Sequence, residues 1–181
     1  MKISQTIKLI TYPRSGMNFF RALIAHHGYW ISASHNTEFF LPAPRVVTII
    51  RNPKSSIASH YAMISEYNDK NNLDALEPIT KEYTNHYKWF DLNAEYFILY
   101  ENLINNPKKT VEDFFKYFNI PYESVENYNR IIIRDDPSSS HITSSAGLPK
   151  HSEALASLKG FAALGDAEKA YGELIQKHSI K

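Results

Sequence analysis

Residues 7–20 read IKLITYPRSGMNFF, an apolar run followed by a Pro-Arg-Ser-Gly turn and then by further apolar residues. The run 7–12 predicts a buried strand, and after Gly16 apolar residues recur at the spacing of one helix face. A helix N-terminus after such a turn can hold an anion, because it offers unpaired backbone N–H groups and the positive end of the helix dipole. The stretch therefore raises the question of which anion this loop binds.

The residues of this loop allow two interpretations. Gly16 lets the backbone approach a ligand closely, Arg14 can grip two oxygens of an anion, and Ser15 and Asn18 add side-chain donors. The alternative is an ordinary strand-to-helix connection in which Ser15 caps the helix. The loop is not a Walker A motif, because no Gly-Lys-Ser/Thr follows four residues after a first glycine.

The same order of strand, loop and helix recurs along the chain. RVVTII at 45–50 is a β-branched run typical of a buried parallel strand, and Pro53 then opens a helix. EYFILYEN at 95–102 predicts another buried strand, and Asn106 caps the helix after it. We also expect an extended stretch at 29–32 and helices at 81–91 and from about 166. This recurrence predicts an α/β fold, a parallel β-sheet flanked by α-helices.

A second basic loop, RNPKSSIAS, follows the strand at 45–50. Arg51 begins it, and Ser59 comes eight residues later on the predicted helix. Ligands of open α/β sheets collect at the carboxyl ends of the strands, so we expect both basic loops to point into one crevice. Two anion sites in one crevice suit a ligand that carries two separate phosphates.

Length and composition narrow the class of protein. The chain has 181 residues, which predicts a single domain over 1–181, and DDPSSSHITSSAGL at 135–148 predicts a mobile loop. A net charge of +1 argues against nucleic acid or membrane as the partner. The sequence has no cysteine, which excludes disulfides, thiolate metal sites and cysteine nucleophiles. Without a secretory leader or a run of about 18 apolar residues, we expect a cytoplasmic protein.

Three stretches together resemble the sulfotransferases that use 3′-phosphoadenosine 5′-phosphosulfate (PAPS). TYPRSGMNF is similar to their 5′-phosphosulfate loop, and RNPKSSIAS is similar to their 3′-phosphate motif, an Arg followed eight residues later by Ser. YENLINNPKKTVEDFFKYFNIP resembles the Tyr-Glu-Asp-Leu segment that usually follows. The three occur in the family's order over roughly residues 7–121. The resemblance implies a P-loop-like nucleotide-binding fold, PAPS as the sulfuryl donor and 3′,5′-ADP as the product.

The resemblance also implies roles for individual residues. Arg14 would contact the 5′-phosphosulfate and its bridging oxygen, which makes it both a catalytic and a cofactor-binding residue. Arg51 and Ser59 would bind the 3′-phosphate. The remaining cofactor-binding residues would surround the 5′ group and the adenosine: Ser15, Gly16, Met17, Asn18, Phe19 and Tyr100.

The sequence departs from the family pattern at several points. Met17 and Asn18 replace the usual two threonines, and Arg14 replaces the lysine of many members. The family's late Arg-Lys-Gly segment, which closes over the 3′-phosphate, has no clean match, and Lys150 and Lys159 are the candidates to replace it.

An acceptor hydroxyl or amine needs a general base, which contributes roughly 10²–10⁴-fold to the rate. His35 lies in ISASHNTEFFLP, whose position resembles the family's Lys-Thr-His-Leu-Pro region, and Glu38 is the alternative base. An ordinary imidazole pKa of about 6.5 suits this role. No metal is needed if the loop N–H groups and Arg14 neutralise the leaving group. The acceptor, a small molecule or a glycan, and the oligomeric state do not follow from the sequence.

Two other functions remain open at this point. A P-loop-like kinase that uses ATP and Mg²⁺ would share the fold, but the sequence lacks both Gly-Lys-Ser/Thr and an evident Walker B aspartate. An inactive nucleotide-binding module would keep the crevice and lack turnover, and the altered loop is compatible with that function.

Overall fold

The computed structural model describes residues 7–37, 45–68, 73–124 and 149–180. These residues form two compact units. The first unit comprises 7–11, 16–37, 45–50 and 95–124, and the second comprises 12–15, 51–68, 73–94 and 149–180. The single domain over 1–181 stays a prediction, and the segment 135–148 lies outside the described residues.

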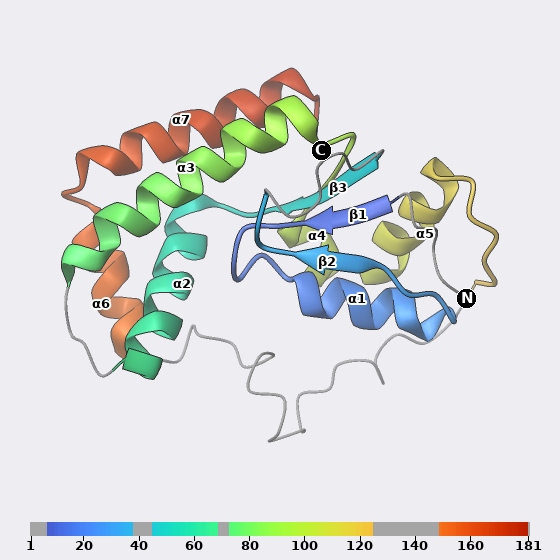
Figure 1. Ribbon diagram of the computed structural model, residues 1–181, viewed down its shortest axis with the longest axis horizontal. Coiled ribbons are helices and arrows are strands. Elements are labelled where there is room, and N and C mark those ends of the chain that lie inside the picture. Colours follow the sequence, from blue (N-terminus) through green and yellow to red (C-terminus); the bar gives the residue numbers. More distant parts are fainter. Residues whose placement is uncertain (1–6, 38–44, 69–72, 125–148, 181) are drawn as a thin grey trace. The chain divides into compact units, whose positions relative to one another are not determined.

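The described part of the first unit contains a four-stranded sheet in which every pairing is parallel (Figure 1). The strands are β1 (Ile7–Ile10), β2 (Ser32–Ser34), β3 (Arg45–Ile50) and β4 (Tyr96–Leu99). Their order is β2-β1-β3-β4, so β1 lies between β2 and β3. The α/β fold with a parallel sheet is confirmed, and the carboxyl ends of all four strands lie at the same edge.

The described part of the first unit also contains three helices: α1 (Met17–His26), α4 (Tyr100–Asn105) and α5 (Pro107–Tyr117). The apolar face predicted for α1 is buried, and its Phe20 ring meets Phe114 of α5 edge-on at 5.3 Å between ring centres. Gly28, in a left-handed conformation with φ 75°, donates its N–H to the Ala25 carbonyl just beyond the end of α1. The core therefore forms between the sheet, α1 and α5.

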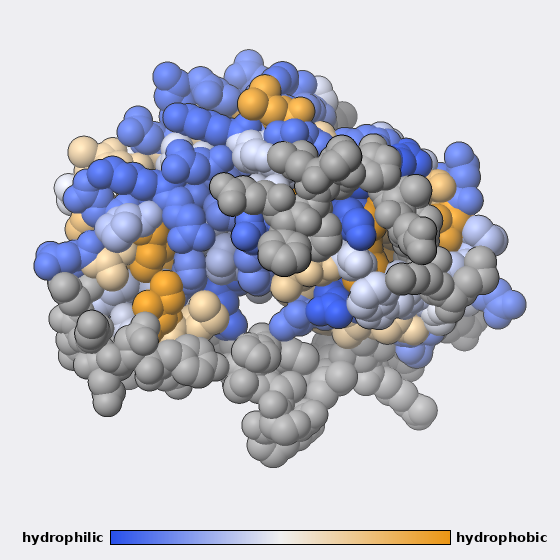
Figure 2. Space-filling model, viewed as in Figure 1, coloured by the Kyte–Doolittle hydropathy of each residue, from blue (hydrophilic) through white to orange (hydrophobic). Residues whose placement is uncertain are grey.

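The second unit is helical. It contains α2 (Pro53–Asn68), the short 3₁₀ helix η1 (Leu73–Ala75), α3 (Leu76–Asn93), α6 (Pro149–Leu158) and α7 (Ala162–Lys177). Helix α3 runs along α7, and α2 packs against α6 and α3 (Figure 1). The rings of Tyr83 and Tyr87 stack inside this unit at 4.0 Å, whereas the visible outer face of α3 and α7 is mostly hydrophilic (Figure 2).

Several predicted elements change in extent. The strand predicted at 95–102 is wrong beyond Leu99, because Tyr100 begins α4. The extended stretch predicted at 29–32 becomes β2 at Ser32–Ser34, and α3 is longer than the predicted 81–91. Helix α6 was not predicted. The strand predicted at 45–50 and the helix opened by Pro53 are confirmed.

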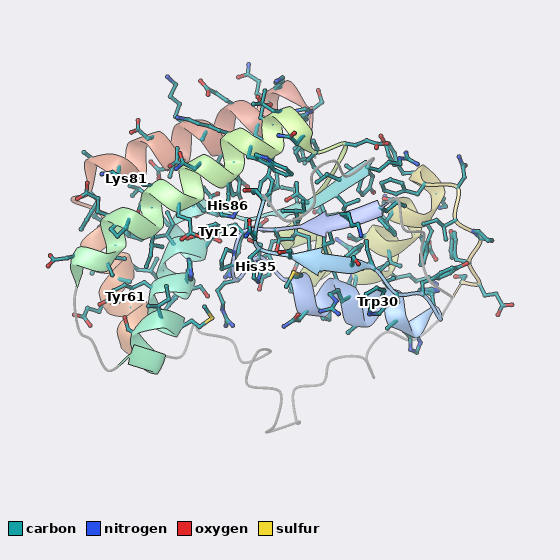
Figure 3. All side chains as sticks on the ribbon, viewed as in Figure 1. Tyr12, Trp30, His35, Tyr61, Lys81 and His86 are labelled. Carbon is teal, nitrogen blue, oxygen red and sulfur yellow. The ribbon has the colours of Figure 1, made fainter. Side chains whose placement is uncertain are left out.

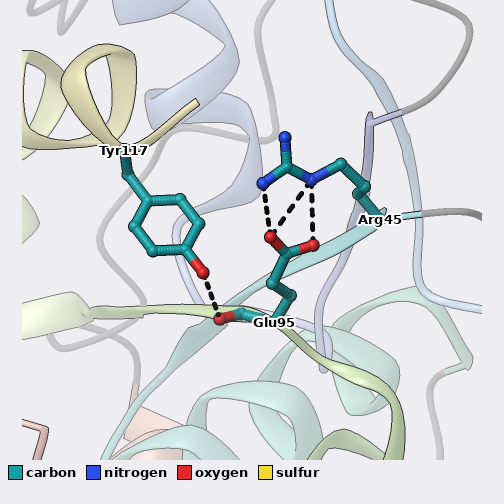
Figure 4. Close-up of polar contacts among 3 residues, drawn as sticks. All are labelled: Arg45, Glu95 and Tyr117. Atoms are coloured by element: carbon teal, nitrogen blue, oxygen red, sulfur yellow. Dashed lines mark hydrogen bonds and ion pairs between the residues drawn. The ribbon is translucent and has the colours of Figure 1, made fainter. Parts of the chain in front are cut away.

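An ion pair at the amino end of the sheet joins Arg45, the first residue of β3, to Glu95, the residue before β4. Nε of Arg45 donates to both carboxylate oxygens of Glu95, at 3.1 and 3.0 Å, and Nη2 donates to one of them as well (Figure 4). The Arg45 guanidinium also lies 4.4 Å from the centre of the Phe118 ring. These hydrogen bonds hold the pKa of Glu95 below its usual value.

Candidate functional site

The two predicted anion loops meet within the second unit. Nη1 of Arg51 donates a hydrogen bond of 2.8 Å to the backbone carbonyl of Arg14. Arg14 adopts a left-handed conformation with φ 64°, which is uncommon for a residue with a side chain and occurs preferentially at functional turns. The bond joins residues that are 37 positions apart in sequence. It fixes the guanidinium of one loop against the backbone of the other.

The backbone of Arg51 is held by two buried tyrosines of α3. Its carbonyl accepts hydrogen bonds from the hydroxyls of Tyr83 (2.7 Å) and Tyr87 (3.0 Å), and its N–H donates to the Tyr87 oxygen at 2.7 Å. Burial raises the pKa of the Tyr83 hydroxyl, which therefore stays a donor. No sequence signal identifies these tyrosines as the groups that hold Arg51.

A third tyrosine fixes the start of the first loop. Tyr12 is fully buried, and its hydroxyl donates to the Ile79 carbonyl at 3.2 Å and lies 2.8 Å from Nδ1 of His60. Its ring meets those of Tyr83 and His86 edge-on, with ring centres 5.0 and 5.4 Å away; Tyr12 and His86 are labelled in Figure 3. The segment 12–15 is thereby attached to α2 and α3, two helices of the same unit.

Polar side chains near Arg51 are buried without a hydrogen-bond partner among the described residues. The hydroxyls of Ser15 and Ser56 are both fully buried and make no hydrogen bond there. Ser15 follows Arg14, and Ser56 lies in the first turn of α2, where its N–H donates to the Asn52 carbonyl. A buried polar group without a partner costs roughly 1–3 kcal/mol, so these hydroxyls are suited to a polar ligand.

Ser59, the second residue of the predicted 3′-phosphate motif, is buried one helical turn beyond Ser56 on α2. Helix α2 begins at Pro53, close after Arg51 in the chain, and Asn52 accepts the N–H groups of Ser55 (through its side chain, 3.4 Å) and Ser56 (through its carbonyl, 3.0 Å) at this end of the helix. The second unit therefore combines a guanidinium, a helix N-terminus and buried hydroxyls, the groups that bind phosphate in proteins.

In the first unit, Gly16 is the residue at the N-cap of α1, with φ 90°, and no side chain caps this end of the helix. Ser15 is therefore not the helix cap that the alternative interpretation required. A Cβ atom at Gly16 would lie 3.1 Å from the Tyr100 ring and 3.3 Å from Leu103. Only glycine fits both the left-handed backbone and this close approach. Tyr100, predicted to lie near the nucleotide, is thus placed against the start of α1.

The other predicted residues of the first loop are partly buried. Met17 and Phe19 pack against the apolar core of the first unit, and Asn18 has intermediate exposure. Their predicted contacts with the cofactor stay predictions.

His35 lies directly after β2 and is held by Thr11, the residue after β1. Its Nδ1 is 2.8 Å from the Thr11 carbonyl and 3.3 Å from the Thr11 hydroxyl. Because a carbonyl only accepts, Nδ1 carries the proton in this contact, so Nε2 is the ring nitrogen that can accept a proton. Thr11 is itself fixed, since its N–H donates to the Ser34 carbonyl at 3.1 Å. The geometry presents an oriented imidazole at the carboxyl edge of the sheet.

Of the larger aromatic side chains, Trp30 belongs to the same unit as His35. Trp30 precedes β2 whereas His35 follows it, so the two lie at opposite ends of that strand (Figure 3). Tyr61, Tyr83 and Tyr87 belong to the core of the second unit. Glu38, Phe39 and Phe40 lie outside the described residues.

Within the described ranges, no group of three or more His, Asp or Glu side chains is arranged to hold a metal ion. The expectation that no metal is needed stays a prediction. No helix in the described part of the chain has the length and apolar character to cross a membrane.

A scan against protein-family models matches residues 31–169 to the sulfotransferase domain. The match covers most of the chain. The protein belongs to the sulfotransferase family. The matched range contains His35, Arg51, Ser59 and Tyr100, whereas the loop at 14–19 precedes it. No curated protein matches the chain significantly.

Two features of this region are compatible with an anionic ligand. The buried hydroxyls of Ser15 and Ser56 have no hydrogen-bond partner among the described residues, and the left-handed Gly16 leaves no room for a Cβ atom beside Tyr100. The function proposed below rests on these residues and on the match to the sulfotransferase family.

Proposed function

We propose that the protein transfers a sulfuryl group from PAPS to a hydroxyl or amine acceptor. The observation that carries the proposal is the hydrogen bond from Arg51 to the Arg14 carbonyl, because it joins the two loops that a doubly phosphorylated nucleotide would need. The family match supports sulfuryl transfer in general. The unpartnered hydroxyls and the left-handed Arg14 support an anionic ligand at this place.

Each loop would bind one end of the cofactor. Arg51 and Ser59, with the N-terminal turn of α2, would hold the 3′-phosphate. Arg14 and Ser15, with the backbone N–H groups of Gly16, Met17 and Asn18, would hold the 5′-phosphosulfate. Phe19 and Tyr100 would contact the adenosine. When bound, PAPS supplies the activated sulfuryl group.

The protein's own contribution to the reaction is positioning, charge neutralisation and proton transfer. Arg14 would stabilise the negative charge that develops on the leaving side, and a fixed guanidinium does so without reorganisation during the reaction. Nε2 of His35 would accept the acceptor's proton, because Nδ1–H is committed to the Thr11 carbonyl.

A thermal shift with 3′,5′-ADP, AMP and ATP·Mg²⁺ tests the nucleotide assignment. A ligand at about 100 times its Kd stabilises the fold by roughly 2.7 kcal/mol, which raises the melting temperature measurably. We expect a shift with 3′,5′-ADP that greatly exceeds the shift with AMP. A shift with ATP·Mg²⁺ alone would favour the kinase, and no shift with any nucleotide would contradict a nucleotide site.

Turnover is tested separately, with PAPS and a pool of phenols, alcohols and amines as acceptors. We propose a small molecule or a glycan as the natural acceptor and a cytoplasmic location for the reaction. Formation of 3′,5′-ADP that depends on an acceptor would support the enzyme. Tight binding of 3′,5′-ADP without any turnover would favour the inactive module.

A further inference from the structure

Tyr12 and His60 form a buried hydrogen bond inside the second unit, to which the proposed function gives no role. The Tyr12 oxygen lies 2.8 Å from Nδ1 of His60, Tyr12 is fully buried, and His60 is 6% exposed. Their rings also meet edge-on, with ring centres 5.2 Å apart. The contact joins the first residue of the segment 12–15 to helix α2, 48 positions further along the chain.

The direction of this hydrogen bond follows from the single proton of the Tyr12 hydroxyl. That hydroxyl donates to the backbone carbonyl of Ile79 at 3.2 Å, and a carbonyl only accepts. Burial raises the pKa of the hydroxyl, so it keeps its proton. With that proton committed to Ile79, Nδ1 of His60 has to be the donor to the Tyr12 oxygen. Both buried side chains then have a partner for the atoms that meet, as buried polar groups generally do.

The hydrogen bond holds one end of a short segment whose other end is held by Arg51. Nη1 of Arg51 donates to the Arg14 carbonyl at 2.8 Å, two residues after Tyr12. Pro13 lies between these two fixed points, and its ring restricts the backbone angle φ. Arg51 precedes α2 and His60 belongs to it, so both contacts attach the segment to one stretch of the chain. Loss of either contact would leave the Arg14 loop held at one end.

Neighbouring residues of α2 would thereby serve the two anion loops separately. Ser59 is the residue that we propose for the 3′-phosphate, and His60, directly after it, contacts the first loop. Successive side chains of a helix point about 100° apart, so the two leave α2 in different directions. A substitution at His60 can therefore change the first loop while the Ser59 side chain stays in place.

We infer that His60 is a positioning residue, which donates to Tyr12 and so holds Arg14 and Ser15 in the geometry that binds the 5′-phosphosulfate. The inference rests on the proposed function, because it assigns this loop to the 5′ end of the nucleotide. His60 acts through Tyr12 and needs no contact with the nucleotide. Loss of its hydrogen bond should weaken the hold on the 5′ group and leave the 3′-phosphate site unchanged.

Isothermal titration calorimetry with 3′,5′-ADP and with adenosine 3′-monophosphate (3′-AMP) isolates the first loop, because the two nucleotides differ only in the 5′-phosphate. His60→Leu should weaken binding of 3′,5′-ADP about tenfold, the upper worth of a hydrogen bond between neutral groups, and change the Kd for 3′-AMP by less than about twofold. A general loosening of the fold would weaken both nucleotides alike.

Two conservative substitutions test whether the donor position is what counts. His60→Asn places an amide N–H group close to the position of Nδ1 and should restore most of the affinity for 3′,5′-ADP. His60→Gln places its amide near the position of Nε2 and should bind as weakly as His60→Leu. Equal affinities of the Asn and Gln variants would contradict the role of the Nδ1 donor.

His86→Leu is the matched control. The His86 ring also meets Tyr12 edge-on, but its Nδ1 lies 3.0 Å from the Glu82 carbonyl of its own helix. This variant should bind both nucleotides as the wild type does. The double variant of Tyr12→Phe and His60→Leu should be no weaker than Tyr12→Phe alone, because His60 acts through the Tyr12 hydroxyl.

Long-range ¹H–¹⁵N NMR spectra of the free protein show whether Nδ1 of His60 carries a proton, and the signal is assigned by its loss in His60→Leu. We expect a protonated Nδ1, and an unprotonated Nδ1 would overturn the inference. If the wild type does not bind 3′,5′-ADP, the proposed function and this inference both fail. If it binds, but His60→Leu weakens both nucleotides equally or neither of them, only the role of His60 is overturned. Should His60→Leu not fold, the comparison of His60→Asn with His60→Gln still decides.

Discussion

Strand β3 has an arginine at each end, and the two differ in what they contact. Arg45, its first residue, donates to the carboxylate of Glu95 and covers the Phe118 ring, so its charge is balanced within the protein. Arg51, directly after its last residue, donates to the neutral carbonyl of Arg14, while two tyrosines hold its backbone. A carboxylate balances the positive charge of Arg45, whereas the hydrogen bond that Arg51 donates to the first loop goes to a neutral carbonyl.

The comparison extends to the groups around each arginine. At the amino end the Tyr117 hydroxyl donates to the Glu95 carbonyl at 3.5 Å, which adds a further internal contact. Near Arg51, the hydroxyls of Ser15 and Ser56 are buried without partners among the described residues. The polar groups around Arg45 therefore bond to one another, whereas the hydroxyls of Ser15 and Ser56 can still bond to a ligand.

The largest effect is expected at His35, which belongs to the carboxyl edge. His35→Gln should lower turnover by roughly 10²–10⁴-fold, because it removes the base while the Thr11 carbonyl stays in place. The Kd for 3′,5′-ADP should change by less than about twofold. Initial rates with PAPS and calorimetric titration measure the two quantities. Unchanged turnover would remove His35 from the mechanism and direct attention to Glu38.

A pair of substitutions tests the two arginines of β3 directly. Arg51→Ala should weaken binding of 3′,5′-ADP by roughly 10- to 100-fold, the worth of a hydrogen bond to a charged group, and binding of AMP far less. Arg45→Ala should leave both affinities unchanged. Calorimetric titration of each variant with 3′,5′-ADP and with AMP gives the four dissociation constants. Equal losses of affinity for 3′,5′-ADP and AMP in Arg51→Ala would contradict the assignment of Arg51 to the 3′-phosphate.

Gly16 and Gly28 form a matched pair at the two ends of α1. Both have positive φ, but a Cβ at Gly16 would meet Tyr100 at 3.1 Å, whereas a Cβ at Gly28 would meet nothing within 4 Å. Gly28→Ala should cost about 1 kcal/mol in the free energy of unfolding, and Gly16→Ala roughly 1–2 kcal/mol more. Urea denaturation measures both. Equal costs would show that the Tyr100 ring does not constrain Gly16.

The smallest effect is expected at the amino end. The pKa of Glu95 is lowered by Arg45, so the pair stabilises the fold above the ordinary Glu pKa, and this contribution is lost as pH falls through the lowered value. Since the Glu95 side chain is 33% exposed, Glu95→Gln should cost only about 0.2–1 kcal/mol at pH 7. The difference between wild type and variant should shrink by pH 3. A difference in unfolding free energy that persists at pH 3 would contradict the ion pair as its cause.

Local signals explain which parts of the fold could be predicted. The β-branched run at 45–50 and Pro53 after it act through neighbouring residues, and the strand and the helix appear where these signals placed them. The strand predicted at 95–102 was too long. Tyr100 fits the residue pattern of a strand, but it begins α4, and its ring lies beside Gly16. Helix α6 gave a weak periodic signal, since its buried face is defined by its contact with α2.

The same distinction holds for the candidate site. The Arg14 and Arg51 loops could be found from the sequence, because each is a short motif at the end of a predicted strand. The tautomer of His35 and the tyrosines that hold Arg51 could not. The contacts that decide these features join residues from 24 to 36 positions apart.

From the sequence alone come the α/β fold, the parallel sheet and the two basic loops, because hydrophobic periodicity, proline and glycine act over a few neighbouring residues. Tertiary structure alone decided which charges are balanced and which buried polar atoms remain for a ligand. Those outcomes depend on burial and hydrogen-bond geometry between distant segments, which no local pattern encodes.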